Sequence, residues 1–284
     1  MRKFLSIALV LLMVFSMACA CAEESGWQNI LLLGGDARNM NQYDRSDTMI
    51  ILSINRDEGQ VKMTSVMRDT WVNFPGREAS GKINAATVYG GPELAVATVN
   101  SAFGTDIEDY VIVNMEDLVT IIDLLGGVDI EITDAERKQL NSYAAGYTGK
   151  AYSGAKSIDH SGMVHLNGLL AMSYCRIRYT DNDYKRVMRQ QTVLLELANK
   201  AQNMEVQELS EISDQIFATI NTNLDDEELE DLVMAFMTVD IEEVGQYRIP
   251  VDGTFRSGMF NGVWLIDPDF EQNQELLREF IYGD

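Results

Sequence analysis

The sequence has few of the residues that carry common enzyme chemistry. It contains 2 histidines and 3 cysteines in 284 residues. Cys19 and Cys21 lie in the apolar start of the chain, so removal of that start leaves Cys175 alone and no internal disulfide can form. We interpret Cys175 as a small packed side chain, because so little histidine argues against a catalytic cysteine.

Several sequence signatures are also missing. There is no Gly-Lys-Ser/Thr phosphate loop, no dinucleotide fingerprint and no Gly-x-Ser-x-Gly elbow. His160 and His165 are too loosely spaced for a metal motif, and we expect them to be structural or to face solvent. An excess of basic charge is absent as well, since the net charge is −22. This balance argues against nucleic acid as a partner.

The first 22 residues are predicted to direct export. Arg2 and Lys3 precede a largely apolar run over 4–18, and Ala20-Cys21-Ala22 has the small-x-small pattern of a cleavage site. We interpret residues 1–22 as a signal peptide or an N-terminal membrane anchor, although a bilayer span needs ~20 apolar residues. A lipid on Cys19 or Cys21 is a third alternative. Each alternative places the rest of the chain outside the cytoplasm.

Apolar runs bounded by turn residues predict an α/β fold, with a central mixed β-sheet and helices packed on both faces. The predicted strands are 29–33, 48–54, 61–66, 70–74, 110–113, 128–132, 246–251 and 263–266. The predicted helices are 91–103, 116–125, 167–174, 187–201, 206–220, 226–236 and 271–282. Residues 141–163 are predicted to form a surface loop. With no repeat or linker, 27–284 is predicted to be one domain.

Acidic and basic residues occur together at the ends of predicted strands. These segments are Gly34-Gly35-Asp36-Ala37-Arg38, Arg45-Ser46-Asp47 and Arg68-Asp69-Thr70. Strands in a sheet lie ~4.8 Å apart, so loops at neighbouring strand ends come close together, and such loops commonly hold ligands. Surface ion pairs are the alternative interpretation.

A second cluster of arginines lies at short spacings in Arg176-x-Arg178 and Arg186-x-x-Arg189-Gln190. An extended chain places the first two on one face, and a helix places Arg186 and Arg189 on one face. Guanidinium groups bind phosphate oxygens, whereas carboxylates repel them unless a divalent cation lies between. Because Mg²⁺ takes one or two carboxylates plus phosphate oxygens, the combined clusters predict a metal-bound diphosphate site. A solvated charged face is the alternative.

The order and spacing of these motifs resemble the LytR-CpsA-Psr family over about residues 29–201, with weaker similarity over 202–284. The matching segments are 29–38, 45–49, 68–70, Lys82-Ile83-Asn84-Ala85-Ala86, 89–94, Asp123-x-x-Gly126-Gly127-Val128, 176–178 and 186–190. The sequence departs from the family pattern at Met67, where a proline is usual, and at 182–185. Neither departure removes a charged group of the predicted site.

The resemblance implies an enzyme of the bacterial envelope, located at the cell wall or the outer face of the plasma membrane. Such an enzyme moves a phosphoglycopolymer, for example teichoic acid or capsule, from a polyprenyl-diphosphate carrier onto peptidoglycan. The lipid tail is then expected in an apolar tunnel between sheet and helices. A polyprenyl-phosphate-binding protein without turnover and a pyrophosphatase that acts on lipid diphosphates are the alternatives.

The resemblance also implies roles for individual residues. Asp36 and Asp47 are expected to hold Mg²⁺ (or Mn²⁺), and the expected catalytic residues are Asp47, Arg45, Arg68 and Arg176. The residues expected to bind the diphosphate are Arg38, Arg45, Arg68, Lys82, Asn84, Arg176, Arg178, Arg186, Arg189 and Gln190.

Overall fold

A computed structural model describes residues 26–35, 43–149, 152, 154–178 and 183–283. Its strands are β1 (Trp27–Gly35), β2 (Ser46–Asn55), β3 (Gln60–Val66), β4 (Trp71–Asn73), β5 (Ser80–Lys82), β6 (Asp109–Asn114), β7 (Val128–Ile132), β8 (Gly162–Leu166), β9 (Asn221–Thr222), β10 (Gly245–Ile249), β11 (Phe255–Phe260) and β12 (Val263–Pro268). Its helices are α2 (Ala86–Phe103), α3 (Met115–Leu124), α4 (Asp134–Ala145), α5 (Gly168–Cys175), α6 (Asp183–Gln202), α7 (Val206–Phe217), α8 (Asp226–Thr238) and α9 (Phe270–Tyr282). Within the described ranges, no helix is long and apolar enough to cross a membrane.

The central sheet is mixed, as predicted. It has six strands in the order β10-β3-β2-β1-β6-β9. β1 pairs antiparallel with β2 and parallel with β6, and β10 pairs parallel with β3. β9 and β10 come from residues after 201. The sheet therefore takes strands both from residues 29–201, where the family resemblance is strong, and from residues 202–284, where it is weaker.

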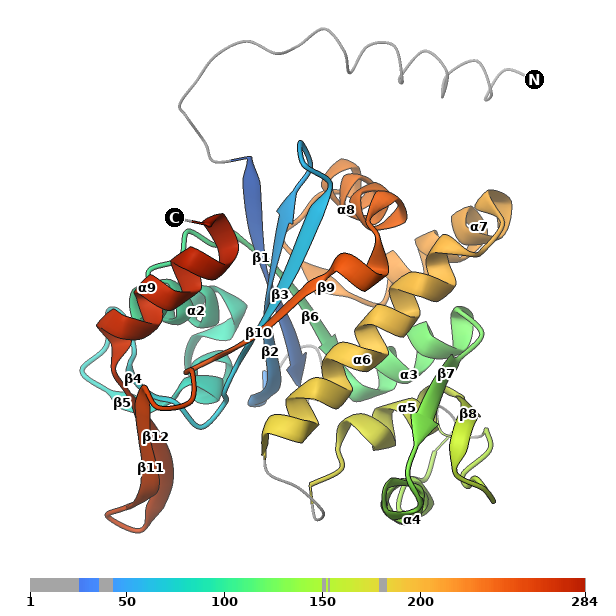
Figure 1. Ribbon diagram of the computed structural model, residues 1–284, viewed down its shortest axis with the longest axis horizontal. Helices are drawn as coiled ribbons and strands as arrows, with labels where there is room; N and C mark the ends of the chain where they lie inside the picture. The colour runs from blue at the N-terminus through green and yellow to red at the C-terminus, as the bar shows by residue number, and fades with distance from the viewer. Residues whose placement is uncertain (1–25, 36–42, 150–151, 153, 179–182, 284) are drawn as a thin grey trace, which may run out of the picture.

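Both faces of the sheet are covered by helices, which confirms the predicted α/β fold (Figure 1). Along β1, Leu31 and Leu33 pack into a core with α2 and α9. The alternate residues Ile30 and Leu32 pack into a second core with α6 and α8. Successive side chains of a strand point to opposite faces. The run Ile30–Leu33 is therefore continuously apolar because each of its residues meets a helix layer.

A third core joins α3, α4 and α5 to the antiparallel pair of strands β7 and β8. The predicted loop over 141–163 is wrong at both ends, because α4 extends to Ala145 and β8 begins at Gly162. The Thr133 hydroxyl accepts from the Glu136 N–H, and the Glu136 carboxylate accepts from the Thr133 N–H. This capping box is a sequence signal for the start of α4.

The helix predicted at 91–103 forms the second part of α2. Gly91 has φ 72°, a left-handed conformation that favours glycine, and the helix resumes at Pro92. Proline suits the first turn of a helix because it lacks the N–H that would find no partner there. The first part begins at Ala86. It directly follows the turn that contains Asn84 and the strand β5 that ends at Lys82.

The close packing of α5 on α3 generates a stability prediction. The Gly168 N–H donates to the Asp123 Oδ1 at 2.7 Å, and a Cβ on Gly168 would lie 2.1 Å from the Val119 carbonyl oxygen. Gly168→Ala therefore pushes the two helices apart, and we expect a loss of roughly 1–3 kcal/mol in the free energy of unfolding. Urea denaturation measures it. The control Gly258→Ala has its nearest contact at 3.8 Å, and equal midpoints for the two variants would contradict the prediction.

Candidate active site

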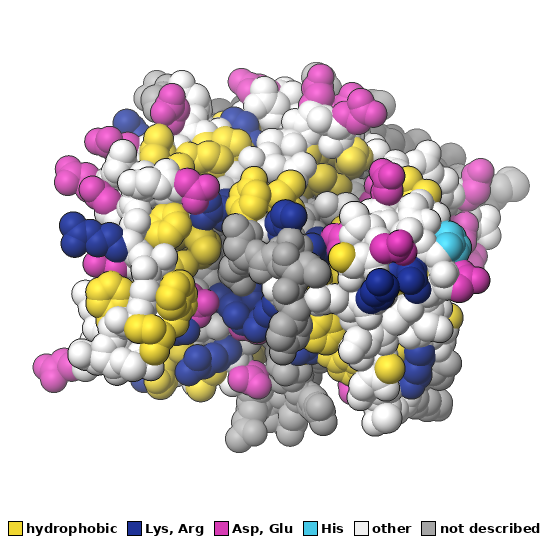
Figure 2. Space-filling model, turned by 60° about the horizontal axis from the view of Figure 1, so that its bottom comes forward, with side chains coloured by type: hydrophobic (Ala, Val, Ile, Leu, Met, Phe, Trp, Pro, Cys, Tyr) yellow, Lys and Arg dark blue, Asp and Glu magenta, His cyan; other side chains and the backbone are white. Residues whose placement is uncertain are grey.

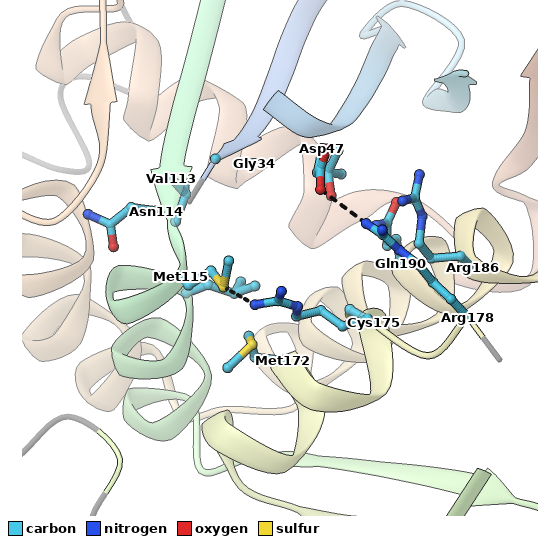
Figure 3. Close-up of a pocket in the computed structure, with 14 residues that line it drawn as sticks. Gly34, Asp47, Val113, Asn114, Met115, Met172, Cys175, Arg178, Arg186 and Gln190 are labelled. Carbon is cyan, nitrogen blue, oxygen red and sulfur yellow. Dashed lines mark hydrogen bonds and ion pairs between the residues drawn. The ribbon is translucent and has the colours of Figure 1, made fainter. Parts of the chain in front are cut away.

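A cavity of about 80 Å³ opens where β1 and β6 end and β2 begins; we call it the polar cavity for its charged side chains, although most of its wall is apolar. The end of α5 and the starts of α6 and α3 complete its wall (Figure 3). It is lined by Gly34, Gly35, Asp47, Thr48, Val113, Asn114, Met115, Leu118, Met172, Cys175, Arg176, Arg178, Arg186 and Gln190. The predicted location at strand ends is therefore where the structure places a cavity.

Asp47 is the centre of the charged groups. Its Oδ1 lies 2.7 Å from the Arg68 Nη1 and its Oδ2 lies 3.1 Å from the Arg178 Nη2. The Asn84 side-chain amide also donates to Oδ1, at 3.2 Å. The structure thus brings together residues from the start of β2, the segment after β3, the turn before α2 and the segment after α5.

The charge state of Asp47 follows from these neighbours. Burial raises the pKa of its carboxyl, but the guanidinium groups of Arg68, Arg178 and Arg186 outweigh burial and lower the pKa below its ordinary value. Asp47 is therefore ionised at neutral pH. A lowered pKa also means that the ion pairs weaken only in acid, as the pH falls through the folded-state value.

The arginines that follow α5 and the arginine near the start of α6 line the same cavity. Arg178, Arg186 and Gln190 point toward Asp47 (Figure 3). Arg186 is 2% exposed, so its charge acts where water is largely excluded. In such surroundings a fixed positive charge stabilises a bound anion much more strongly than at an exposed surface.

Arg176 caps the end of α5 and is oriented by two neighbours. Its Nη1 donates to the Tyr147 hydroxyl and approaches the Met115 sulfur at 2.9 Å. The guanidinium carbon lies 5.8 Å from the centre of the Tyr147 ring. Tyr147 belongs to the stretch predicted as a loop, and no sequence pattern signalled its contact with the site.

Two residues of the predicted diphosphate set have carboxylate partners of their own. Arg189 lies 2.9 Å from Glu136 and 3.3 Å from the carbonyl oxygen of Ile177, and it is not among the residues lining the cavity. Lys82 lies 2.6 Å from Asp69, beside Arg68. The geometry of α6 explains why Arg189 does not line the cavity. Gln190 follows Arg186 by about one turn and shares its side of the helix, whereas Arg189 is rotated toward α4.

The remaining predicted residues are placed as follows. Arg45 is exposed just before β2, where its N–H donates to the Asp44 carboxylate at 2.7 Å. Asp36 and Arg38 lie outside the described residues. Cys175 lines the cavity wall, and burial raises the pKa of its thiol to about 12. It stays protonated at neutral pH, which agrees with its interpretation as a packed side chain rather than a nucleophile.

The metal prediction rests on few described donors. Among the residues that the structure describes, no three His, Cys, Asp or Glu side chains are grouped as a metal centre. Asp47 supplies a carboxylate in the cavity, beside cationic groups that suit phosphate. This donor set fits an ion that takes one or two carboxylates and completes its coordination with phosphate oxygens and water, as Mg²⁺ does.

A second cavity, of about 290 Å³, lies between the sheet and the helices α3, α6, α7 and α8. Its lining is almost wholly apolar: Leu32, Leu52, Met63, Val111, Ile121, Leu125, Leu194, Leu195, Leu197, Ala198, Ala201, Leu209, Ser213, Ile216, Phe217, Ile220, Leu229, Leu232, Val233 and Met237. The acidic helices α7 and α8 thus turn apolar side chains inward and form one wall of this cavity.

The same elements line both cavities. On β1, Gly34 borders the polar cavity and Leu32 the apolar one, and on β6 the matching residues are Val113 and Val111. Residues two apart on a strand share a face. The two cavities therefore adjoin along one face of the sheet.

The helices show the same continuity. On α3, Leu118 borders the polar cavity, and Ile121 and Leu125 border the apolar one. On α6, Gln190 is followed one turn later by Leu194, which lies in the apolar cavity. Because residues three or four apart share a helix face, we interpret the two cavities as one channel with a cationic mouth and an apolar interior.

Comparison with known proteins agrees with this arrangement. The family model described as the LytR_cpsA_psr family matches residues 13–280. The chain belongs to the LytR-CpsA-Psr family. Relatives in this family include the polyisoprenyl-teichoic acid–peptidoglycan teichoic acid transferase TagU of Bacillus cereus, which is 31% identical over 239 residues, or 83% of this chain and 72% of TagU. The TagU of Oceanobacillus iheyensis is 33% identical over 259 residues, or 85% of this chain and 71% of that protein.

Solved structures of family members have the same fold. TagT bound to LIIa-WTA superposes with a TM-score of 0.74 at 25% identity, covering 95% of this chain and 96% of TagT. Bacillus subtilis TagV superposes with a TM-score of 0.71 at 23% identity, covering 91% of this chain and 98% of TagV, and supports the fold alone. The predicted family and fold are thus confirmed.

The buried ion pair of Arg189 generates a prediction for this family member. Arg189 and Glu136 are 5% and 15% exposed, so Glu136→Ala leaves a buried guanidinium without its carboxylate and also removes the capping contact with Thr133. We expect a loss of about 3–5 kcal/mol in unfolding free energy. The control Asp134→Ala breaks an exposed pair with Arg137 on the same helix and should cost far less, because solvent screens an exposed ion pair. Similar losses for both variants in chemical denaturation would show that Arg189 does not depend on this pair.

Proposed function

We propose that this protein transfers a phosphoglycopolymer of the teichoic-acid type from a polyprenyl-diphosphate carrier to peptidoglycan, outside the cytoplasm. The observation that carries the proposal is the pair of adjoining cavities, one lined by arginines and the other almost wholly apolar. Their shape and chemistry match a donor with an anionic head and a hydrocarbon tail. The relatives named as teichoic acid transferases support the same substrates.

The diphosphate would lie among Arg68, Arg176, Arg178 and Arg186. Arg68 and Arg178 pair with Asp47. A diphosphate brings more negative charge than one carboxylate and offers oxygens that suit the planar guanidinium fork. We therefore expect these arginines to contact both Asp47 and the donor phosphates. Gln190 and Asn84 would donate uncharged hydrogen bonds to the phosphate oxygens.

Mg²⁺ (or Mn²⁺) would be held by Asp47 and the donor phosphates, with Asp36 as the second carboxylate of the sequence prediction. Bound there, the ion would neutralise charge on the phosphate oxygens and so make phosphorus easier to attack. The lowered pKa of Asp47 favours this role, because an ionised carboxylate is the form that binds a hard cation.

In the proposed reaction, a hydroxyl oxygen of peptidoglycan attacks the phosphorus bonded to the glycopolymer. A new phosphorus–oxygen bond forms, the bond to the bridging oxygen breaks, and polyprenyl phosphate leaves with the electron pair. The arginines stabilise the charge that develops on the bridging oxygen. Asp47 is a weak base while Arg68 and Arg178 lower its pKa. The negative charge of a bound diphosphate would raise that pKa, and the Asp47 oxygen that does not hold the metal would accept the hydroxyl proton.

The activity itself is tested with the purified protein, a polyprenyl-diphosphate-linked sugar, Mg²⁺ and peptidoglycan. We expect sugar phosphate to become attached to peptidoglycan, and Asp47→Asn to reduce the rate by about 100-fold or more. Asp57→Asn, in the distant β2–β3 turn, serves as the control. Chelation with EDTA should abolish transfer, and added Mg²⁺ should restore it.

Other outcomes of this assay identify the alternatives. Tight donor binding without any product would favour a polyprenyl-phosphate-binding protein. Cleavage of the donor that does not depend on peptidoglycan would favour a lipid pyrophosphatase. Full activity in EDTA would remove the metal from the proposal while leaving the transfer intact.

The apolar interior of the channel generates a separate prediction. Ala198 lines the apolar cavity, so Ala198→Phe fills space that the lipid tail would occupy. We expect transfer from a long polyprenyl donor to fall roughly tenfold, whereas a donor with a single short prenyl group keeps its rate. The control Asn199→Phe places the same side chain on the exposed side of α6. Equal loss with both donors would show that the tail does not enter this cavity.

A further inference from the structure

The β11–β12 hairpin presents large hydrophobic side chains to solvent at its tip. Met259 is 64% exposed, Trp264 50%, and Phe260 and Val263 each 43%. From Ser257 to Ile266 the sequence contains no charged residue. A contiguous apolar surface of this kind generally marks an interaction site rather than ordinary surface.

The tip is apolar on both of its faces. Met259 pairs with Trp264, and the next pair along is Phe260 with Val263. Paired residues share a face, and successive pairs point to opposite faces. A two-stranded sheet that packs on a protein or a sugar through one face commonly keeps its other face polar. Apolar side chains on both faces indicate that the tip enters an apolar medium.

The base of the hairpin is firmly attached to the active-site segment. Leu265 and Ile266 are 8% and 3% exposed. The Ile266 N–H donates to the Asp69 carbonyl oxygen at 3.0 Å, and Thr70 forms a bridge with Ile266. Asp69 directly follows Arg68, which contacts Asp47. Whatever the tip binds is therefore held in a constant position relative to the cationic mouth.

The position of the hairpin also separates it from the acidic helices. It projects from the end of the molecule where β1 ends and β2 begins, whereas α7 and α8 lie toward the opposite end (Figure 1). Within α7 and α8 there are acidic residues but no Lys or Arg. On the hairpin's face of the molecule, Lys and Arg side chains lie near its middle and hydrophobic ones to the left (Figure 2). An anionic lipid surface would attract the basic middle of this face and repel the acidic helices.

We propose that the tip of the β11–β12 hairpin inserts into the surface of an anionic lipid bilayer and holds the mouth of the channel against it. Trp264 and Phe260 would lie at the level of the lipid headgroups, where aromatic residues are enriched. Such insertion is shallow and reversible, and it needs no membrane-spanning helix. It extends the proposed function by giving the protein a route to a membrane-bound donor, but it is measured without any transfer reaction.

The experiment measures binding of the purified full chain to vesicles of phosphatidylglycerol and phosphatidylethanolamine, with the N-terminus of the protein determined by mass spectrometry. We expect Met259→Asp combined with Trp264→Asp to lower the partition coefficient roughly tenfold or more, because both side chains lose apolar burial. Met163→Asp is the matched control, since Met163 is 65% exposed on β8. It should bind as the unchanged protein does.

A second readout tests the hairpin directly and is insensitive to any other attachment. Brominated lipids should quench tryptophan emission in the unchanged protein, and Trp264→Tyr should remove the quenched component while Trp27 and Trp71 remain. Transfer from a short-chain, water-soluble donor should be the same in all variants, so a failure of the proposed function is seen separately.

Three results would overturn the proposal. Emission of Trp264 that is not quenched by brominated lipids would place the tip outside the bilayer. Equal vesicle binding by the hairpin variant and the Met163→Asp control would do the same. Loss of binding to isolated peptidoglycan in the hairpin variant, with vesicle binding intact, would assign the tip to the acceptor polymer.

Discussion

The concentration of guanidinium groups around Asp47 is the constraint on which the site depends. Arg68 and Arg178 contact its two oxygens, and Arg186 adds its charge from a position that is nearly buried. Like charges repel, so cations from separate segments stay together only if anions lie among them. Asp47 and, beside Arg68, Asp69 supply negative charge here, and a diphosphate would add more. The cluster therefore favours binding of an anion before any contact with a sugar or a lipid is considered.

The apolar channel is a consequence of how the strands and helices continue past that cluster. Gly34 and Leu32 share one face of β1, and Gln190 and Leu194 share one face of α6. Residues two apart on a strand, or four apart on a helix, share a face. Along β1 and α6 that face therefore passes from the polar cavity to the apolar one within two or four residues. The acidic helices α7 and α8 have a role in this arrangement, because their apolar sides form the far wall of the channel.

The end of β1 and the start of β2, which border the polar cavity, lie at the same end of the molecule as the β11–β12 hairpin (Figure 1). The contact between Ile266 and Asp69 ties them together through the backbone rather than through flexible side chains. A protein that binds a lipid-linked donor benefits from such a rigid connection, since the donor headgroup is confined to a thin layer. If the hairpin inserts as proposed, the acidic helices α7 and α8 would lie on the side of the molecule away from the anionic membrane.

By itself, the sequence determined the family, the mixed α/β fold and the strand ends where Asp47 and Arg68 lie. Such features are local, because a continuous apolar run reports burial on both faces and a turn residue reports where a strand stops. The loop predicted over 141–163 failed at both ends, although Thr133 and Glu136 carried the signal for α4. Only the tertiary structure decided that Arg186 faces the channel while Arg189 pairs with Glu136, and that Tyr147 orients Arg176. Those choices depend on which distant segments pack against each residue, and the spacing of charges along the chain carries no information about that packing.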